Sequence, residues 1–169
     1  ITVMSALVYG AVRQNYRQTA NDPQIQIAED LAAQLTTGQN QFNLPPTKVD
    51  LAVSLAPFII ILDADGKALY NSAALDGESP VPPRGVLDYT KANGKHRVTW
   101  QPKKGVREAI ALAYFTNSKN GKGGYIIAGR SLREVEKRVA NLGFEVAAAW
   151  FTAMVASGIA LWAAREKIV

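Results

Sequence analysis

SLREVEKRVANLGFEVAAAWFTAMVASGIALWAAREKIV, residues 131–169, is the stretch that decides how this chain folds. Between Val146 and Ala164 no residue is charged and most are apolar. As a helix, these ~19 residues would extend roughly 28 Å at ~1.5 Å per residue, enough to cross the hydrocarbon core of a bilayer. Trp150 and Trp162 lie near the two ends, where aromatic rings favour the headgroup level. The stretch predicts a transmembrane helix; the alternative is a buried core helix of a soluble protein.

The predicted membrane helix begins well before its apolar part. Ser131, followed three residues later by Glu134, is typical of a capping box, so the helix is expected to begin there. It would continue into the bilayer without interruption, with Gly143 as its one weak point. The sequence thus predicts a rigid rod that joins a polar domain to the membrane.

Small residues recur at helical spacing inside the predicted span. They lie on the side of the helix that continues an apolar 3-4 pattern from Leu132, which suits packing against another helix. Small side chains let two helix backbones approach closely in lipid. The alternative is that alanine is simply common in such helices. The predicted packing residues are Ala149, Ala153, Ser157, Ala156 and Ala160.

Charge is distributed unevenly along the 169 residues, although the formal net charge is only +5. Residues 22–90 hold nine acidic and three basic residues, whereas residues 91–133 hold ten basic residues and one acidic residue, Glu108. This asymmetry predicts a basic face that meets lipid headgroups or an acidic partner; a merely solvated face is the alternative. Nucleic acid is not expected, because aromatic residues do not alternate with arginine. The predicted basic face consists of Lys91, Lys95, Arg97, Lys103, Lys104, Lys119 and Lys122.

The N-terminal run, residues 1–12, is apolar but too short to span a bilayer. The sequence also begins without Met, so we expect residues 1–20 to hold the end of a first, truncated transmembrane helix and its exit. The hydrophobic part of a signal peptide is the competing interpretation.

Helix and strand signals alternate between the two apolar ends. Asp22-Pro23 predicts a helix start, and Gly38 its end near residue 37. The run 58–62 predicts a strand buried on both faces, and the turn dipeptide Asp65-Gly66 leads to a second strand over 67–71. Loops are predicted over 38–50 and 75–85, a short helix over 86–92, and three antiparallel strands over 96–102, 106–115 and 123–131.

This order of elements resembles the extracytoplasmic PAS-like, or Cache, domains of bacterial membrane sensors. The segments FIIILDADGKALYNS, HRVTWQP, ALAYF and GGYIIAGRSLREVEKR carry the resemblance. It implies an α+β fold, with a five-stranded antiparallel sheet and packed helices over residues 21–130. We expect a truncated transmembrane helix before this domain, and over residues 131–169 a connecting helix that is continuous with a complete transmembrane helix.

The resemblance leaves two functions open. In sensors of this family an output domain follows the second span, whereas only five residues follow Ala164 here. We therefore expect a non-catalytic accessory subunit whose domain docks on a larger integral membrane complex, for example a respiratory or other energy-converting assembly. The alternative is a sensory input module that binds a small ligand and signals to a kinase-type partner. The expected location is the bacterial inner membrane, with the domain on the extracytoplasmic side and a homodimer possible.

Residues able to carry chemistry are few. The chain has no Cys and one His, so neither a thiolate site nor a Ser-His-Asp arrangement can be argued, and His96 is interpreted as a surface residue. Asp63 to Gly66 begins like a calcium loop but has Ala74 where a bidentate Glu is needed. Neither an enzyme activity, a metal nor a cofactor is expected. The side chains that the resemblance places around a ligand cavity are Trp100, Arg107, Tyr114 and Arg130.

Overall fold

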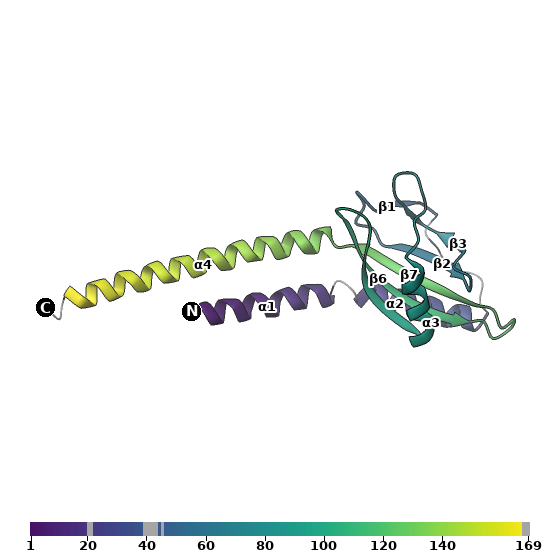
Figure 1. The fold of residues 1–169 in the computed structure, drawn as a ribbon, viewed down its shortest axis with the longest axis horizontal. Helices are drawn as coiled ribbons and strands as arrows, with labels where there is room; N and C mark the ends of the chain where they lie inside the picture. The colour runs from purple at the N-terminus through teal and green to yellow at the C-terminus, as the bar shows by residue number, and fades with distance from the viewer. Residues whose placement is uncertain (20–21, 39–43, 45, 167–169) are drawn as a thin grey trace. The chain divides into compact units, whose positions relative to one another are not determined.

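The computed structural model describes residues 1–19, 22–38, 44 and 46–166 (Figure 1). The chain forms two compact units, one made of residues 1–18 and 135–169 and the other of residues 19–134. We refer to them as the helical unit and the sheet domain. The helices are α1 (Thr2–Thr19), α2 (Asp22–Thr36), α3 (Arg84–Asn93) and α4 (Arg133–Glu166).

An antiparallel sheet of five strands forms the centre of the sheet domain, with the strand order β3-β2-β7-β6-β5. The last strand therefore lies between the first hairpin and the second, which ties the two ends of the domain together. The strands are β2 (Phe58–Asp63), β3 (Ala68–Asn71), β5 (Lys95–Lys103), β6 (Val106–Thr116) and β7 (Gly123–Ser131). Two short strands, β1 (Val49–Asp50) and β4 (Ala73–Ala74), pair in parallel beside it.

The β2–β3 hairpin forms where the sequence predicts it. The Asp63 carboxylate accepts hydrogen bonds from the amides of Asp65 and Lys67, at 3.0 and 2.8 Å, and Gly66 takes a φ of 83° that suits glycine. This geometry confirms the turn interpretation of the acidic run. Strand β2 is buried on both faces, as its continuous apolar sequence predicts.

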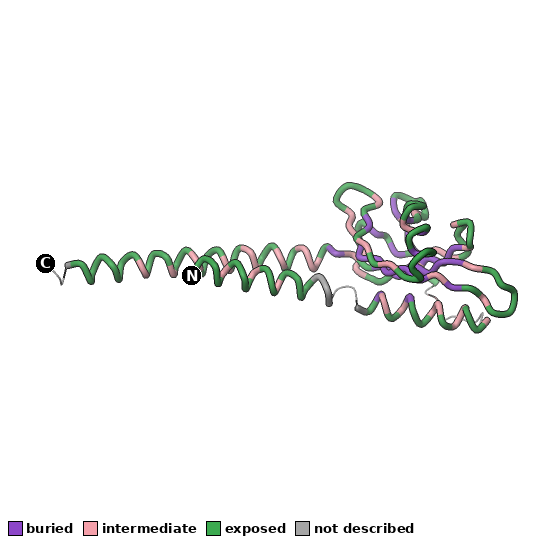
Figure 2. The backbone as a smooth tube through the Cα atoms, turned by 60° about the horizontal axis from the view of Figure 1, so that its bottom comes forward, coloured by how far each residue is buried: buried purple, intermediate pink, exposed green. Residues whose placement is uncertain are grey.

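Each face of the sheet carries its own apolar layer. On one face, Phe58, Ile110 and Ile127 pack with Leu87 of α3. On the other face, Ile126 and other apolar residues pack with Ala28 of α2. Figure 2 shows buried residues concentrated along the strands of this domain. With a layer on each side, β6 and β7 are buried on both faces over most of their length, whereas the edge strand β5 alternates between exposed and buried positions.

The long C-terminal helix runs from Arg133 to Glu166 without a break, so Gly143 does not interrupt it. The Ser131 hydroxyl accepts a 3.3 Å hydrogen bond from the amide of Arg133, one residue short of the predicted capping box. The other predicted helices are also found, and α3 begins two residues earlier than expected. Strands β1 and β4 were not predicted, and part of the loop expected over 38–50 lies outside the described residues.

Candidate functional site

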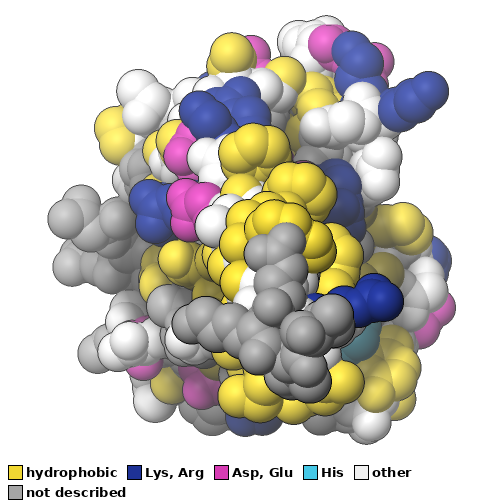
Figure 3. All heavy atoms as spheres, turned by 90° about the vertical axis from the view of Figure 1, so that its left-hand side faces the viewer, with side chains coloured by type: hydrophobic (Ala, Val, Ile, Leu, Met, Phe, Trp, Pro, Cys, Tyr) yellow, Lys and Arg dark blue, Asp and Glu magenta, His cyan; other side chains and the backbone are white. Residues whose placement is uncertain are grey.

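Helix α4 leaves most of its apolar side chains exposed. Among the described residues it is the one helix that is long and apolar enough to cross a bilayer, over Arg133–Arg165, and none of its apolar window is buried. Phe144, Leu161 and Trp162 are 78%, 73% and 64% exposed. The space-filling view of Figure 3 shows many hydrophobic side chains at the surface of the face toward the viewer. A helix that is hydrophobic all round needs an apolar surrounding, and this helix has the length to find it in lipid.

Helix α1 packs against α4 within the helical unit. The Trp150 indole N–H donates a 2.9 Å hydrogen bond to the Thr2 hydroxyl, and the Tyr9 ring lies over Gly143. A Cβ atom added at Gly143 would lie 3.4 Å from that ring, an ordinary van der Waals distance, so an alanine would also fit at this position. The groove between them is lined by Thr2, Ser5, Ala6, Tyr9, Val146 and Trp150.

The small residues predicted to mediate helix packing divide between two environments. Ala153 and Ser157 are half-buried, and the Ser157 hydroxyl donates to the carbonyl of Ala153 at 2.8 Å. The other three, Ala149, Ala156 and Ala160, are exposed. These three alanines are spaced seven and four residues apart, so they lie on one side of α4. Their small side chains would allow a further helix to approach the α4 backbone closely.

The four side chains predicted to surround a ligand do not share one face of the sheet. Successive residues of a strand point to opposite faces, and Trp100 and Tyr114 belong to the layer that packs with α3. Arg107 and Arg130 occupy the opposite phase of β6 and β7, because Arg130 pairs with Ala109. Trp100 is buried and its ring lies 6.3 Å from that of Phe58, so it serves the core. A single site built from all four would need side chains to cross the sheet.

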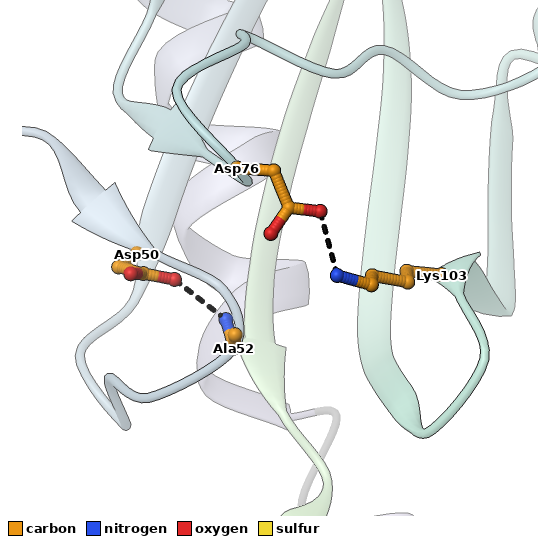
Figure 4. A network of polar contacts seen from close by, with 4 residues as sticks. All are labelled: Asp50, Ala52, Asp76 and Lys103. Atoms are coloured by element: carbon orange, nitrogen blue, oxygen red, sulfur yellow. Dashed lines mark hydrogen bonds and ion pairs between the residues drawn. The ribbon is translucent and has the colours of Figure 1, made fainter.

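The predicted basic residues are partly neutralised by the acidic half of the chain. Lys95 forms a 2.9 Å ion pair with Glu29, and Lys103 forms a 2.8 Å ion pair with Asp76 (Figure 4). Lys119 donates to the carbonyl of Gly38, and the Lys91 ammonium lies 5.9 Å from the centre of the Tyr114 ring. Of the seven predicted basic residues, Arg97, Lys104 and Lys122 have no hydrogen-bond or ion-pair partner among the described residues.

A buried carboxyl lies where the sheet meets the first residue of α4. Glu108 is 1% exposed and is paired across the sheet with Trp100 and Ser131, and its Oε1 atom has no hydrogen-bond partner among the described residues. Burial raises the pKa of Glu108 to about 8, while the positive charge of Arg133 acts in the opposite direction. At neutral pH the carboxyl is therefore mainly protonated.

Arg133 ties the root of α4 to the segment that follows β1. Its guanidinium donates hydrogen bonds to the carbonyls of Ala52, at 3.0 Å, and Val53. The same segment is held by Asp50, whose carboxylate accepts the amide of Ala52 at 2.8 Å (Figure 4). The carbonyl of Arg107 also accepts the amide of Leu132, at 2.9 Å. Leu132 and Arg133 are thus each held by hydrogen bonds to another part of the sheet domain.

The sequence contains a signal for this junction that the prediction did not use. Glu108 shares the strand phase of Ile110 and Leu112, so its position points into an apolar layer. It is also the one acidic residue between Lys91 and Arg133. A charged residue at an inward position of a strand marks a candidate for function or switching.

No known protein-family model matches the chain, and no curated protein was found that matches it.

Proposed function

We propose that this chain is a non-catalytic, membrane-anchored accessory subunit that docks on a larger membrane protein complex. The observation that carries the proposal is the exposure of α4: none of its apolar window is buried among the described residues, although α1 packs along one side of it. In the proposed arrangement, lipid covers most of the exposed apolar surface of α4, and helices of the partner complex cover the rest.

Two further features support a docking role. The exposed row Ala149, Ala156 and Ala160 provides a surface against which a partner helix can pack closely. The unpartnered cations Arg97, Lys104 and Lys122 provide charge for lipid headgroups or for an acidic protein surface. The proposed partner is accordingly an integral membrane protein complex such as an energy-converting assembly.

The sheet domain supports the proposed location. A five-stranded antiparallel sheet with helices on both faces, flanked along the chain by α1 and α4, is the kind of domain expected from the resemblance to extracytoplasmic PAS-like domains. We accordingly propose that the domain lies on the extracytoplasmic side of a bacterial inner membrane.

A second candidate function is a sensory input module. The observation that favours it is the charge interaction between the buried Glu108 and Arg133, the first residue of α4. A ligand or proton that altered the sheet at this point would act directly on the root of the membrane helix. A kinase-type partner would then receive the signal within the membrane.

Native purification separates the two functions. The tagged chain is extracted from its own membranes in a mild detergent, without crosslinker, and analysed by mass spectrometry. An accessory subunit is expected to bring a stoichiometric integral membrane companion. Recovery alone or as a homodimer, combined with a thermal shift produced by a small solute, would contradict the docking proposal and favour the sensor.

A matched pair of variants tests where the companion binds. Ala156→Leu fills the exposed row of small residues and is expected to reduce recovery of the companion at least about tenfold, because the helix backbones can no longer approach. Val155→Leu changes the neighbouring, already bulky position and is expected to leave recovery unchanged. Equal recovery with both variants would exclude the row as the docking surface.

A further inference from the structure

Strand β5 is an open edge of the five-stranded sheet. In the order β3-β2-β7-β6-β5 it has β6 on one side and no strand of the described chain on the other. It has nine residues, whereas the opposite edge strand, β3, has four and carries neither lysine nor arginine. An open edge presents unpaired N–H and C=O groups with which an extended peptide can pair. Strand β5 is therefore the longer of the two places where a strand can be added.

The register with β6 shows which backbone groups of β5 point outward. The amide of Tyr114 donates a 2.8 Å hydrogen bond to the carbonyl of Gly94, so the even-numbered residues of this strand direct their backbone groups at β6. The N–H and C=O groups of Lys95, Arg97 and Thr99 accordingly point away from β6, and no described residue bonds to them. Three donors and three acceptors are thus open along this edge.

Cations mark the side of the edge that faces α2. Lys95 forms its 2.9 Å ion pair with Glu29 of α2, and Arg97 shares its strand phase. The two paired side chains are 70% and 47% exposed, so the pair is weak and leaves Lys95 available. Arg97 has no hydrogen-bond or ion-pair partner among the described residues, and the segment from Lys95 to Lys104 contains no acidic residue. This side of the edge attracts carboxylates.

The side of the edge that faces α3 is aromatic and apolar. Val98 packs against the core layer that contains α3, and the His96 imidazole lies 4.4 Å, centroid to centroid, from the exposed ring of Tyr89. A hollow of about 300 Å³ at the start of β5 is lined from both sides of the strand, by Ile25 of α2 and Tyr89 of α3 among others. An added strand would therefore meet cations with one set of alternate side chains and an apolar, aromatic surface with the other.

We propose that the β5 edge binds an acidic, extended segment of the partner complex as an added antiparallel strand, with carboxylates opposite Lys95 and Arg97 and apolar side chains directed toward Tyr89. The inference rests on the proposed docking role and names the contact that the sheet domain makes. Main-chain hydrogen bonds hold the segment, and its charge pattern selects it. A second copy of this edge is disfavoured, because pairing about Arg97 would place two guanidinium groups opposite each other.

A nine-residue peptide of alternating glutamate and valine, with glutamate at both ends, is the probe. The full chain in nonionic detergent micelles is titrated into the dye-labelled peptide, and binding is followed by fluorescence anisotropy. Saturable binding is expected. It should be at least about tenfold tighter than for a peptide with lysine in place of glutamate, or for the same residues arranged in two blocks, because only alternation puts every carboxylate on the α2 side. Equal binding of the three peptides, or no saturable binding, would overturn the proposal.

Methylation of the peptide amides tests the strand pairing itself. In an antiparallel pair, the glutamates opposite Lys95 and Arg97 direct their N–H groups at β5, and the valines direct theirs away from it. N-methylation of the glutamates is expected to weaken binding at least about tenfold, whereas N-methylation of the valines should leave it within about threefold. Equal losses, or a larger loss with the methylated valines, would contradict an added antiparallel strand.

A charge reversal on β5 locates the binding. Arg97→Glu is expected to weaken binding of the glutamate peptide at least about tenfold and to strengthen binding of the lysine peptide several-fold, a gain that a misfolded protein cannot show. Lys122→Glu makes the same change of charge at an exposed residue between β6 and β7, and should leave both affinities within about twofold. Equal losses in the two variants, or no gain for the lysine peptide, would exclude the β5 edge as the binding site.

Peptide binding and recovery of the membrane companion are separate measurements. If the companion is recovered and the peptide does not bind, the β5 edge is excluded and the docking role remains. If the peptide binds and no companion is recovered, the strand-binding edge remains and the docking role is excluded.

Discussion

Replacement of Gly129 with valine is expected to destabilise the sheet domain by about 3 kcal/mol or more, a large part of the ~5–15 kcal/mol that holds a typical domain together. Gly129 lies on β7 between Phe58 of β2 and Ile110 of β6. A Cβ atom at this position would lie 2.2 Å from the Phe58 ring and 2.8 Å from the Ile110 side chain. Both neighbours are fully buried, so neither ring nor methyl group has space to move into.

Urea unfolding of the full chain in detergent, followed by near-ultraviolet circular dichroism, measures this loss. Gly85→Ala is the matched control, because no atom lies within 4 Å of its added Cβ and the residue lies in the first turn of α3. It is expected to be neutral or to stabilise by up to ~1 kcal/mol. A Gly129→Val variant as stable as Gly85→Ala would mean that the packing of β2 against β7 is wrong.

Glu108 is expected to make the stability of the sheet domain fall as the pH rises. Its pKa is about 8 in the folded chain and 4.5 in the reference state, so the folded domain holds a proton that the unfolded chain releases. The penalty is absent below pH 4.5, grows between 4.5 and 8, and is complete above 8. At about 1.4 kcal/mol for each pKa unit, and with some relaxation on ionisation, we expect a loss on the order of 3 kcal/mol between pH 4 and pH 9.

Glu108→Gln is expected to remove most of this dependence, because an amide of the same shape cannot ionise. Unfolding free energies of the two proteins at pH 4, 7 and 9 test the point. Glu78→Gln, at an exposed turn residue, is the control and is expected to retain the wild-type profile. If the Glu108→Gln profile instead matched the wild type at all three values, the carboxyl would have to be ionised or solvated in the folded chain.

Much of the architecture could be predicted from local sequence. The run from Phe58 to Leu62 is too apolar for an edge strand and forms the buried β2, and Asp65-Gly66 produces the hairpin turn. The same holds for α4, since its uncharged stretch is longer than most soluble helices can bury. Each of these signals lies within a few residues and does not depend on the rest of the fold.

The predictions that failed or fell short depend on contacts between distant residues. Strands β1 and β4 have two residues each and show no periodicity; they form because Val49 and Ala73 meet across the domain. The separation of Trp100 and Tyr114 from Arg107 and Arg130 follows from strand phase and register, which were not worked out from the sequence.

The burial of Glu108 could be predicted only in part from the sequence. Its strand phase was available in the sequence, but the second apolar layer that buries β6 on both faces was not expected. If that face of β6 were open to water, burial would not raise the pKa of the Glu108 carboxyl. The layer that contains α3 and the segment after β1 surrounds it with apolar side chains, and the positive charge of Arg133 acts on it.

Cysteine labelling tests most directly whether α4 lies in lipid. The chain has no native cysteine, so a single introduced thiol gives an unambiguous signal. Ala149, Val155 and Leu161 are exposed, and six-residue steps of about 100° per residue place them on three sides of the helix. Ser118→Cys, at an exposed turn of the sheet domain, is the positive control.

The four cysteine variants are treated with a membrane-impermeant maleimide in native membranes that have been opened by freezing and thawing. Ser118→Cys is expected to react fully. Ala149→Cys, Val155→Cys and Leu161→Cys are expected to react at least about tenfold more slowly until detergent is added, because the thiol is shielded by lipid on every side. Reaction of all three at the rate of Ser118→Cys would show that α4 lies in water and would contradict the membrane anchor on which the proposed function rests.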